Sequence, residues 1–203
     1  MQNEQPKRKS PRLHGYDYGN TGVYFLTICT HDKKRILSKI VGEGFPLPHT
    51  ESHHPNTVGE GSPLPYQSAK VELLYCGKVA DKWINRIPEQ FKGVSVDCCV
   101  IMPNHIHLLL RITKDNVRGS GDPDGRVDPS PTEKAEITTN SVVGWLKYQI
   151  SKEVLSKYDF KDKKIFQRSY YDHIIRDRDD YYRIYKYIKE NPICWQTDIL
   201  YTE

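Results

Sequence analysis

The stretch VSVDCCVIMPNHIHLLLRI, residues 94–112, decides the fold of this chain. Its two halves are rich in β-branched and other apolar residues and are joined through Pro103-Asn104, which predicts two consecutive strands. Successive side chains of a strand point to opposite faces. His105 and His107 therefore share one face of the second strand, while Ile106 between them points to the other face, where we expect the core.

The segments on either side alternate between strand and helix patterns. The bounds that these patterns predict are strands over Gly22–Thr30, Val94–Met102 and His105–Ile112, helices over Ala69–Ile87, Thr138–Tyr158 and Asp177–Asn191, and a partly extended segment over Ile165–Ile175. The order is β-α-β-β-α-β-α. It predicts an α+β fold with a ferredoxin-like (RRM-like) antiparallel sheet, helices on one face, and an additional C-terminal helix.

Two segments, 41–68 and 114–137, do not fit this alternation. They are rich in proline and glycine, and the first contains VGEGFPLP at Val41–Pro48 and again, with one difference, as VGEGSPLP at Val58–Pro65. Two copies are too few for a solenoid, which needs about three or more. Such a composition buries too little apolar surface to offset its ordering entropy. We expect a single domain over residues 1–203 with two flexible insertions.

Composition and charge exclude some classes of protein. No apolar run approaches the ~18 residues that span a bilayer, so no membrane partner is expected. The five cysteines are odd in number and lack CxxC spacing, which favours neither a disulfide framework nor a zinc ribbon and suits a reducing cytoplasm. The N-terminus lacks the apolar stretch of a secretory signal. The net charge of +4 fits a polyanion partner or an ordinary solvated surface.

The two histidines and the closing helix carry the candidate chemistry. Two imidazoles on one face can chelate a divalent metal if a third ligand approaches, and they are also compatible with a purely structural role. In the closing helix, Tyr187 and Asn191 are four residues apart on one flank of the apolar stripe. The Asn191 amide oxygen suits a hard metal. Tyr187 could face what the metal polarises or simply fill the core.

Two motifs resemble those of a known family. MPNHIHLLL at Met102–Leu110 and YIKENP at Tyr187–Pro192 resemble the signature motifs of the single-tyrosine HUH (His-hydrophobic-His) transposases. The segments at Arg8–Thr30 and Ile165–Pro192 resemble the REP-associated branch of that family, the RAYT proteins. The similarity extends over the chain except for the two insertions and the extreme termini.

The resemblance implies a function and roles for individual residues. His105 and His107 match the pair that binds Mg²⁺ or Mn²⁺, Tyr187 matches the nucleophile, and Asn191 stands where the family has a polar third ligand. In this family the tyrosine hydroxyl attacks a phosphodiester of single-stranded DNA, leaving a 5′-phosphotyrosine link and a free 3′-OH that can rejoin strands. A divalent ion neutralises the non-bridging oxygens and fixes the phosphate for in-line attack.

Single-stranded DNA also needs a basic track and aromatic platforms for its bases. Arg12, Gly15 and Tyr16 match an N-terminal pattern that RAYT proteins use to read a short sequence beside a DNA hairpin. The residues around 147–176 are basic and aromatic, and the candidates for DNA contact there are Arg168, His173 and Arg176. A solvated tail and surface residues are the alternative interpretation.

Three functions therefore compete. The first is an active enzyme that nicks and rejoins hairpin-forming DNA repeats, as a monomer or a homodimer. The second is a catalytically silent, domesticated protein that binds DNA hairpins; loss of Tyr187, His105 or His107 would mark it, and all three are present. The third is an RNA-binding module that uses the same sheet, for which the strands lack the aromatic RNP pattern.

Overall fold

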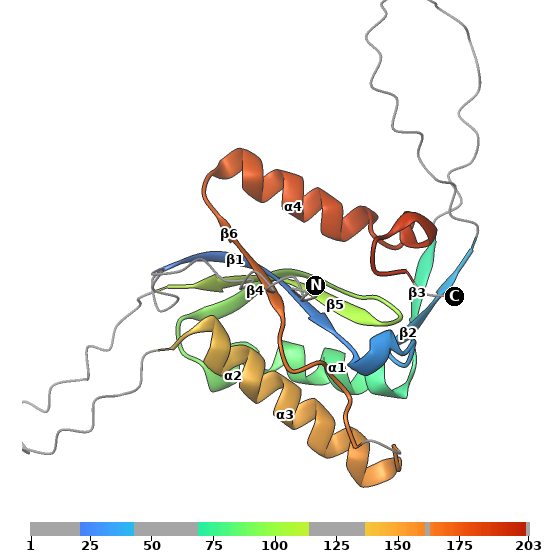
Figure 1. Cartoon of the computed structure of the whole chain (residues 1–203). Helices are drawn as coiled ribbons and strands as arrows, with labels where there is room; N and C mark the ends of the chain where they lie inside the picture. The colour runs from blue at the N-terminus through green and yellow to red at the C-terminus, as the bar shows by residue number, and fades with distance from the viewer. Residues whose placement is uncertain (1–20, 43–68, 114–136, 161–162, 202–203) are drawn as a thin grey trace, which may run out of the picture.

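The computed structural model describes residues 21–42, 69–113, 137–160 and 163–201 (Figure 1). Its main sheet contains β1 (Gly22–Cys29), β4 (Val94–Ile101), β5 (His105–Ile112) and β6 (Tyr171–Ile175) in the order β4-β5-β1-β6. Each neighbouring pair is antiparallel. β1 and β4 thus lie on either side of β5, which is the split βαβ arrangement. The predicted α+β, ferredoxin-like fold is confirmed.

Helices cover both faces of this sheet, unequally. α1 (Tyr75–Asn85), α2 (Ile87–Gln90) and α3 (Thr139–Lys157) lie on one face, and α4 (Arg178–Glu190) lies alone on the other (Figure 1). The larger core contains Leu26, Ile106 and Leu108 packed with residues of α1 and α3. Phe25, Leu109 and their neighbours form a smaller cluster with Ile184 and Ile188 of α4. The alternation expected for the strand after Asn104 is confirmed.

The chain between β1 and α1 differs from the prediction. A short second sheet pairs β2 (Ser38–Val41) with β3 (Lys70–Leu73), and Val41 lies opposite Lys70. The helix predicted to begin at Ala69 begins at Tyr75 instead. In β3 the exposed and half-buried residues alternate with period two. The backbone N–H and C=O groups of β3 form hydrogen bonds with β2 and not within a helix. The prediction over Ala69–Leu74 was wrong because this pairing outweighs the local apolar spacing.

α1 also depends on a close approach to the chain that follows β1. A Cβ atom on Gly77 would lie 2.0 Å from the backbone oxygen of Leu37. That oxygen accepts a hydrogen bond from the Leu74 amide at 2.9 Å, at the start of α1. Only glycine allows the helix to lie this close, so the contact fixes α1 against the segment that leads into β2.

Local capping sets the ends of the two long helices. The Thr138 side chain accepts a hydrogen bond from the Ser141 amide in a capping box that starts α3. Asp177 accepts from the Asp180 amide at 2.8 Å and starts α4. Both predicted helices are confirmed, with their outermost residues serving as caps. The segment before β6 is extended enough for Phe166 to bridge to Thr30.

The two predicted insertions lie almost wholly outside the described residues. At their described ends, Val41 belongs to β2 and Ile137 packs against the larger core. Val41 and Ile137 are therefore part of the fold, and each predicted insertion was placed one residue too far at that end. In the part of the chain that the structure describes, no helix is long and apolar enough to span a membrane.

Candidate active site

The two histidines lie side by side on the face of the sheet that α4 covers. His107 pairs with Thr27 of β1, and His105 pairs with Cys29. Both imidazoles are buried, with 0% of His105 and 2% of His107 exposed. Their Nε2 atoms are 3.0 Å apart. The prediction that both rings lie on one face of the strand is therefore confirmed, and the two Nε2 atoms point toward each other.

Asn104 determines which nitrogen of His105 carries a proton. The Asn104 Nδ2 donates to the backbone oxygen of Leu200 at 2.8 Å, which orients the amide so that Oδ1 faces His105 Nδ1, at 2.8 Å. Because Oδ1 can only accept, Nδ1 must carry the proton. The Nε2 lone pair of His105 is thereby available to a ligand.

Thr27 gives His107 a partner that suits either tautomer. Its Oγ1 lies 2.9 Å from Nδ1 of His107. A hydroxyl can donate or accept, so Thr27 accepts a hydrogen bond from the Nδ1–H group when Nε2 binds a ligand. Outer hydrogen bonds of this kind orient metal-binding histidines.

The environment favours the uncharged form of both rings. Burial lowers the pKa of His105 to about 4, opposed by the charge of Asp198. Burial, with the proximity of His105, lowers the pKa of His107 well below its usual value. Both imidazoles are thus neutral at neutral pH, which is the form that binds a metal.

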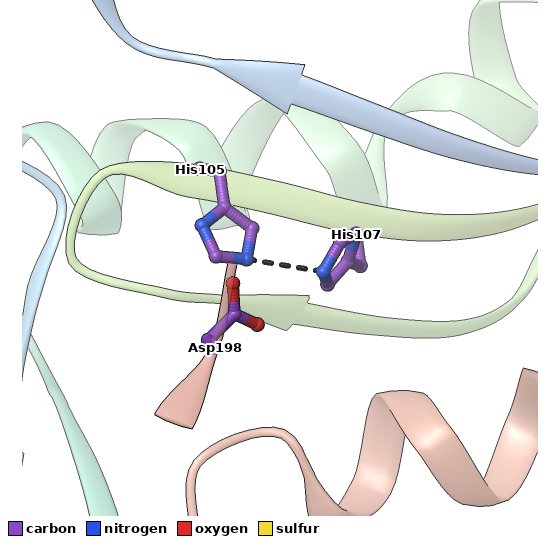
Figure 2. A group of neighbouring side chains, drawn as sticks. All are labelled: His105, His107 and Asp198. Atoms are coloured by element: carbon purple, nitrogen blue, oxygen red, sulfur yellow. Dashed lines mark hydrogen bonds between the residues drawn. The ribbon is translucent and has the colours of Figure 1, made fainter. Parts of the chain in front are cut away.

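Asp198 completes this cluster and was missed in the sequence. It lies after the short 3₁₀ turn Trp195–Thr197, and one of its oxygens lies with the imidazole nitrogens in a group spanning at most 4.8 Å (Figure 2). Its carboxylate accepts hydrogen bonds from the Leu200 amide at 2.6 Å and from Asn191 Nδ2 at 2.9 Å. A lone aspartate outside any periodic segment gives no signal in the sequence.

Asn191 caps the C-terminal end of α4 and is 2% exposed. Its Nδ2 donates to Asp198, while its Oδ1 is buried and has no hydrogen-bond partner among the described residues. A buried oxygen without a partner costs free energy unless something else binds it. Together with two neutral imidazoles and a carboxylate, this oxygen fits a divalent cation.

Tyr187 lies over the histidine pair from α4. Its hydroxyl is 3.5 Å from Nε2 of His107, and the two rings are 5.4 Å apart. Phe25 contacts the tyrosine ring edge-on at 5.9 Å. Partial burial and the charge of Asp198 raise the pKa of Tyr187 to about 12. The phenol is protonated at neutral pH, and 40% of the residue is exposed.

A cavity of about 720 Å³ opens beside this tyrosine. His107 and Tyr187 form part of its wall, and Arg183 of α4 and Ile199 of the C-terminal segment also line it. The volume falls in the range of about 300–1,000 Å³ that is usual for ligand pockets. A substrate in this cavity would touch the tyrosine hydroxyl and one of the two histidines together.

The predicted DNA-contacting residues lie in different places. Arg168 is exposed in the segment that enters β6. His173 is on β6 and contacts the Asp180 carboxylate at 2.8 Å, and Arg176 is exposed at the end of that strand. None of the three lines the cavity beside Tyr187. Arg12, Gly15 and Tyr16 lie outside the described residues.

Fold and site together define a ferredoxin-like protein with a buried histidine pair facing a tyrosine on a separate helix. No protein-family model matches the sequence. An uncharacterized protein of Haemophilus influenzae is 32% identical over 198 residues, covering 97% of this chain and 94% of that protein. The chain belongs to the same family as this relative.

Solved structures of two other proteins are also similar. One is a REP-associated tyrosine transposase bound to a REP hairpin, at 17% identity and a TM-score of 0.47, covering 91% of this chain and 73% of that one. The other is a "putative transposase" of Deinococcus radiodurans, at 16% identity and a TM-score of 0.42, covering 88% of this chain and 95% of that one. Both of these proteins are named transposases.

Proposed function

We propose that this chain is a metal-dependent transposase-like enzyme that cuts and rejoins single-stranded, hairpin-forming DNA through Tyr187. The observation that carries the proposal is the position of the Tyr187 hydroxyl, 3.5 Å from a nitrogen of the buried histidine pair. A structural tyrosine has no need of two neutral imidazoles and a carboxylate around its hydroxyl. A tyrosine that attacks a phosphodiester beside a divalent ion needs neutral imidazoles and a carboxylate close by, because these groups bind the ion.

The residues that would hold the ion are His105, His107 and Asp198, with the Oδ1 atom of Asn191 as a further oxygen. The mixed set of imidazole and oxygen donors is compatible with Mn²⁺, and its oxygens with Mg²⁺. When bound, such an ion neutralises the charge of the phosphate oxygens and orients the phosphorus for attack. We therefore propose Asp198 as a metal ligand in addition to Asn191, which was the only oxygen ligand that the YIKENP motif indicated.

The attack itself is a displacement at phosphorus. The Tyr187 oxygen forms a bond to the phosphorus and the bond from phosphorus to the 3′ oxygen breaks. The phenol gives up its proton and the departing 3′ oxygen takes one up to become the free 3′-OH, so no net proton is released. The link that results conserves the energy of the phosphodiester, so a free 3′-OH can reverse the step without ATP. Asp198 raises the pKa of this phenol through its charge. A cation that offsets that charge would therefore make Tyr187 more acidic.

The RNA-binding alternative is disfavoured by the position of α4. RRM-type binding requires exposed aromatic rings on the central strands of the sheet. On the central strand β1, Phe25 is only 7% exposed and packs in the cluster that α4 forms. The sheet face is covered where such a module would stack bases.

The test is formation of a covalent protein–DNA adduct. Purified protein with Mn²⁺ or Mg²⁺ should give a denaturation-resistant adduct with a hairpin oligonucleotide that has a single-stranded arm, and none with plain duplex. Tyr187→Phe should abolish the adduct and retain DNA binding, because it removes only the hydroxyl. Tyr185→Phe is the matched control, since Tyr185 stacks on Tyr181 on the same helix, at 6.2 Å, and should leave the adduct unchanged.

Metal binding is measured separately by titrating Mn²⁺ into the protein without DNA. Asp198→Asn should weaken Mn²⁺ binding by at least about tenfold, the effect typical of changes around a metal site. Unchanged Mn²⁺ affinity in this variant would remove Asp198 from the site. Tight hairpin binding by the wild-type protein with no adduct under any metal would overturn the enzymatic proposal in favour of a silent hairpin-binding protein.

A further inference from the structure

A row of side chains runs across the site face of the sheet and ends at an exposed tyrosine. Thr27 of β1 pairs with His107 on one side and with Tyr171 of β6 on the other. Directly opposed residues of antiparallel strands project from the same face. Tyr171 therefore projects from the same face as His107, two strands away, at the edge of the sheet.

The ring of Tyr171 is unusually accessible for a residue so near a buried cluster. The residue is 54% exposed and lines the cavity beside Tyr187. Among the described residues, other tyrosines near the sheet pack ring against ring, as Tyr181 does with Tyr185. Within the same part of the chain, no ring contact or side-chain hydrogen bond involves Tyr171.

The backbone that leads to Tyr171 is held in place. The ammonium group of Lys147 on α3 donates to three successive backbone oxygens, of Gln167 at 2.9 Å, Arg168 at 3.3 Å and Ser169 at 3.0 Å. The Tyr170 hydroxyl also lies 3.0 Å from Thr139 Oγ1. Tyr171 is thus an exposed ring on a fixed backbone, which lowers the entropy lost when a ligand stacks on it.

The cavity beside this ring suits a nucleobase. Phe25, Ile184 and Tyr187 give it apolar and aromatic walls, and Gln167 and Arg183 add polar groups at its margin. Flat heteroaromatic rings bind such sites by stacking, and a strand attached to them places its phosphates nearby. Tyr187 and Tyr171 line the same cavity, so a base next to a phosphodiester at Tyr187 is within reach of the Tyr171 ring.

We propose that Tyr171 is a stacking platform for a base of the DNA strand next to the phosphodiester that Tyr187 attacks. This proposal rests on the proposed function and adds to it a binding subsite on β6. Tyr171 supplies its ring and not its hydroxyl, so it contributes to substrate affinity and strand placement without taking part in the bond changes.

The experiment uses full-length protein in EDTA, so that binding is measured without cleavage. The probe is a hairpin oligonucleotide with 2-aminopurine at successive positions of its single-stranded arm, whose fluorescence falls when the base stacks. One position should be quenched by the wild-type protein. Tyr171→Ala should restore its fluorescence and weaken binding by about five- to 150-fold, the range for loss of one stacked base.

Two controls separate stacking from other roles. Tyr171→Phe should bind and quench like the wild type, because the ring is retained. Tyr182→Ala removes a tyrosine of similar exposure, 55%, from α4 at a position that does not line the cavity and should have no effect. The salt dependence of binding should be the same in Tyr171→Ala as in the wild type, because no phosphate contact is lost.

Quenching that persists in Tyr171→Ala, or affinity that does not change, would overturn the proposal. Loss of binding in Tyr171→Phe would do the same, because it would assign the role to the hydroxyl. These outcomes are independent of the adduct assay. Stacking at Tyr171 without any adduct in the presence of metal would contradict the proposed enzymatic function and leave the base-binding subsite in place.

Discussion

At the residue scale, the histidine pair couples folding to pH. Burial holds the pKa of His105 at about 4 in the folded chain, against about 6.5 in the unfolded chain. Between these values the unfolded state binds more protons than the folded state, so stability falls as the pH falls. The contribution of a neutral histidine is complete above pH 6.5, and it is lost progressively as the pH falls toward the folded value.

We therefore expect the metal-free protein to lose stability below pH 6.5, by about 1.4 kcal/mol per pH unit for each buried histidine. The measurement is the free energy of unfolding in urea, with EDTA, at several pH values. His105→Gln removes one titrating ring and should flatten this dependence. An equally steep dependence in His105→Gln would show that other groups cause it.

The sequence identified only some of the residues of this cluster. His105 and His107 could be predicted because strand geometry alone puts alternate side chains on one face. The pairing of Tyr187 with Asn191 followed from helical spacing, whereas the approach of this helix to the histidines was implied only by the family motifs. Asp198 could not be predicted, because its position depends on a hydrogen bond from the Leu200 amide and on one from Asn191.

At the element scale, α4 determines where Tyr187 lies. Ile184 and Ile188 pack the helix on the sheet, and the Tyr181 hydroxyl donates to Asp97 of β4 at 3.1 Å. The Asp177 cap fixes the first turn. Because Tyr187, the proposed nucleophile, lies in the last turn, a change at the other end of the helix tests the stability of the element without touching the site.

Asp177→Ala should destabilise the protein by about 1 kcal/mol, the usual cost of losing an N-cap. For a chain of this size that lowers the melting temperature by about 2–4 °C. Asp177→Asn is the control, because asparagine caps equally well. If Asp177→Asn destabilises as much as Asp177→Ala, the effect comes from the carboxylate charge at the helix N-terminus and not from the cap.

Element boundaries show where local patterns suffice. α3 and α4 carry capping side chains next to apolar stripes, so the sequence predicted both almost to the residue. β3 was mistaken for helix because Val71 and Leu74 have helical spacing, whereas the partner strand that decides the matter, Ser38–Val41, lies across a long insertion in the sequence. Pairing between distant segments is the information that a local pattern lacks.

At the scale of the whole molecule, the site forms where the C-terminal segment folds back onto Asn104 and the start of β5. Leu200 accepts a hydrogen bond from Asn104 at 2.8 Å, and the Trp195 ring lies 5.9 Å from that of His105. The C-terminal turn therefore supplies Asp198 and also covers the histidine pair. Removing this turn would take away Asp198 and uncover His105, so the metal binding proposed above and the burial of His105 depend on the same segment.

The long segment between β2 and β3 tests how much of the chain the fold requires. Val41 and Lys70 are paired across the two strands, so a tight turn can connect the strand ends directly. Replacing residues 43–68 with a short Asn-Gly turn should stabilise the protein slightly, because shortening a loop severalfold lowers its closure cost by about 1–2 kcal/mol. We expect an unchanged or higher melting temperature and the same yield of covalent adduct. A lower adduct yield at unchanged stability would instead show that the repeated VGEGFPLP and VGEGSPLP sequences contribute to DNA binding, although their acidic charge disfavours contact with a polyanion.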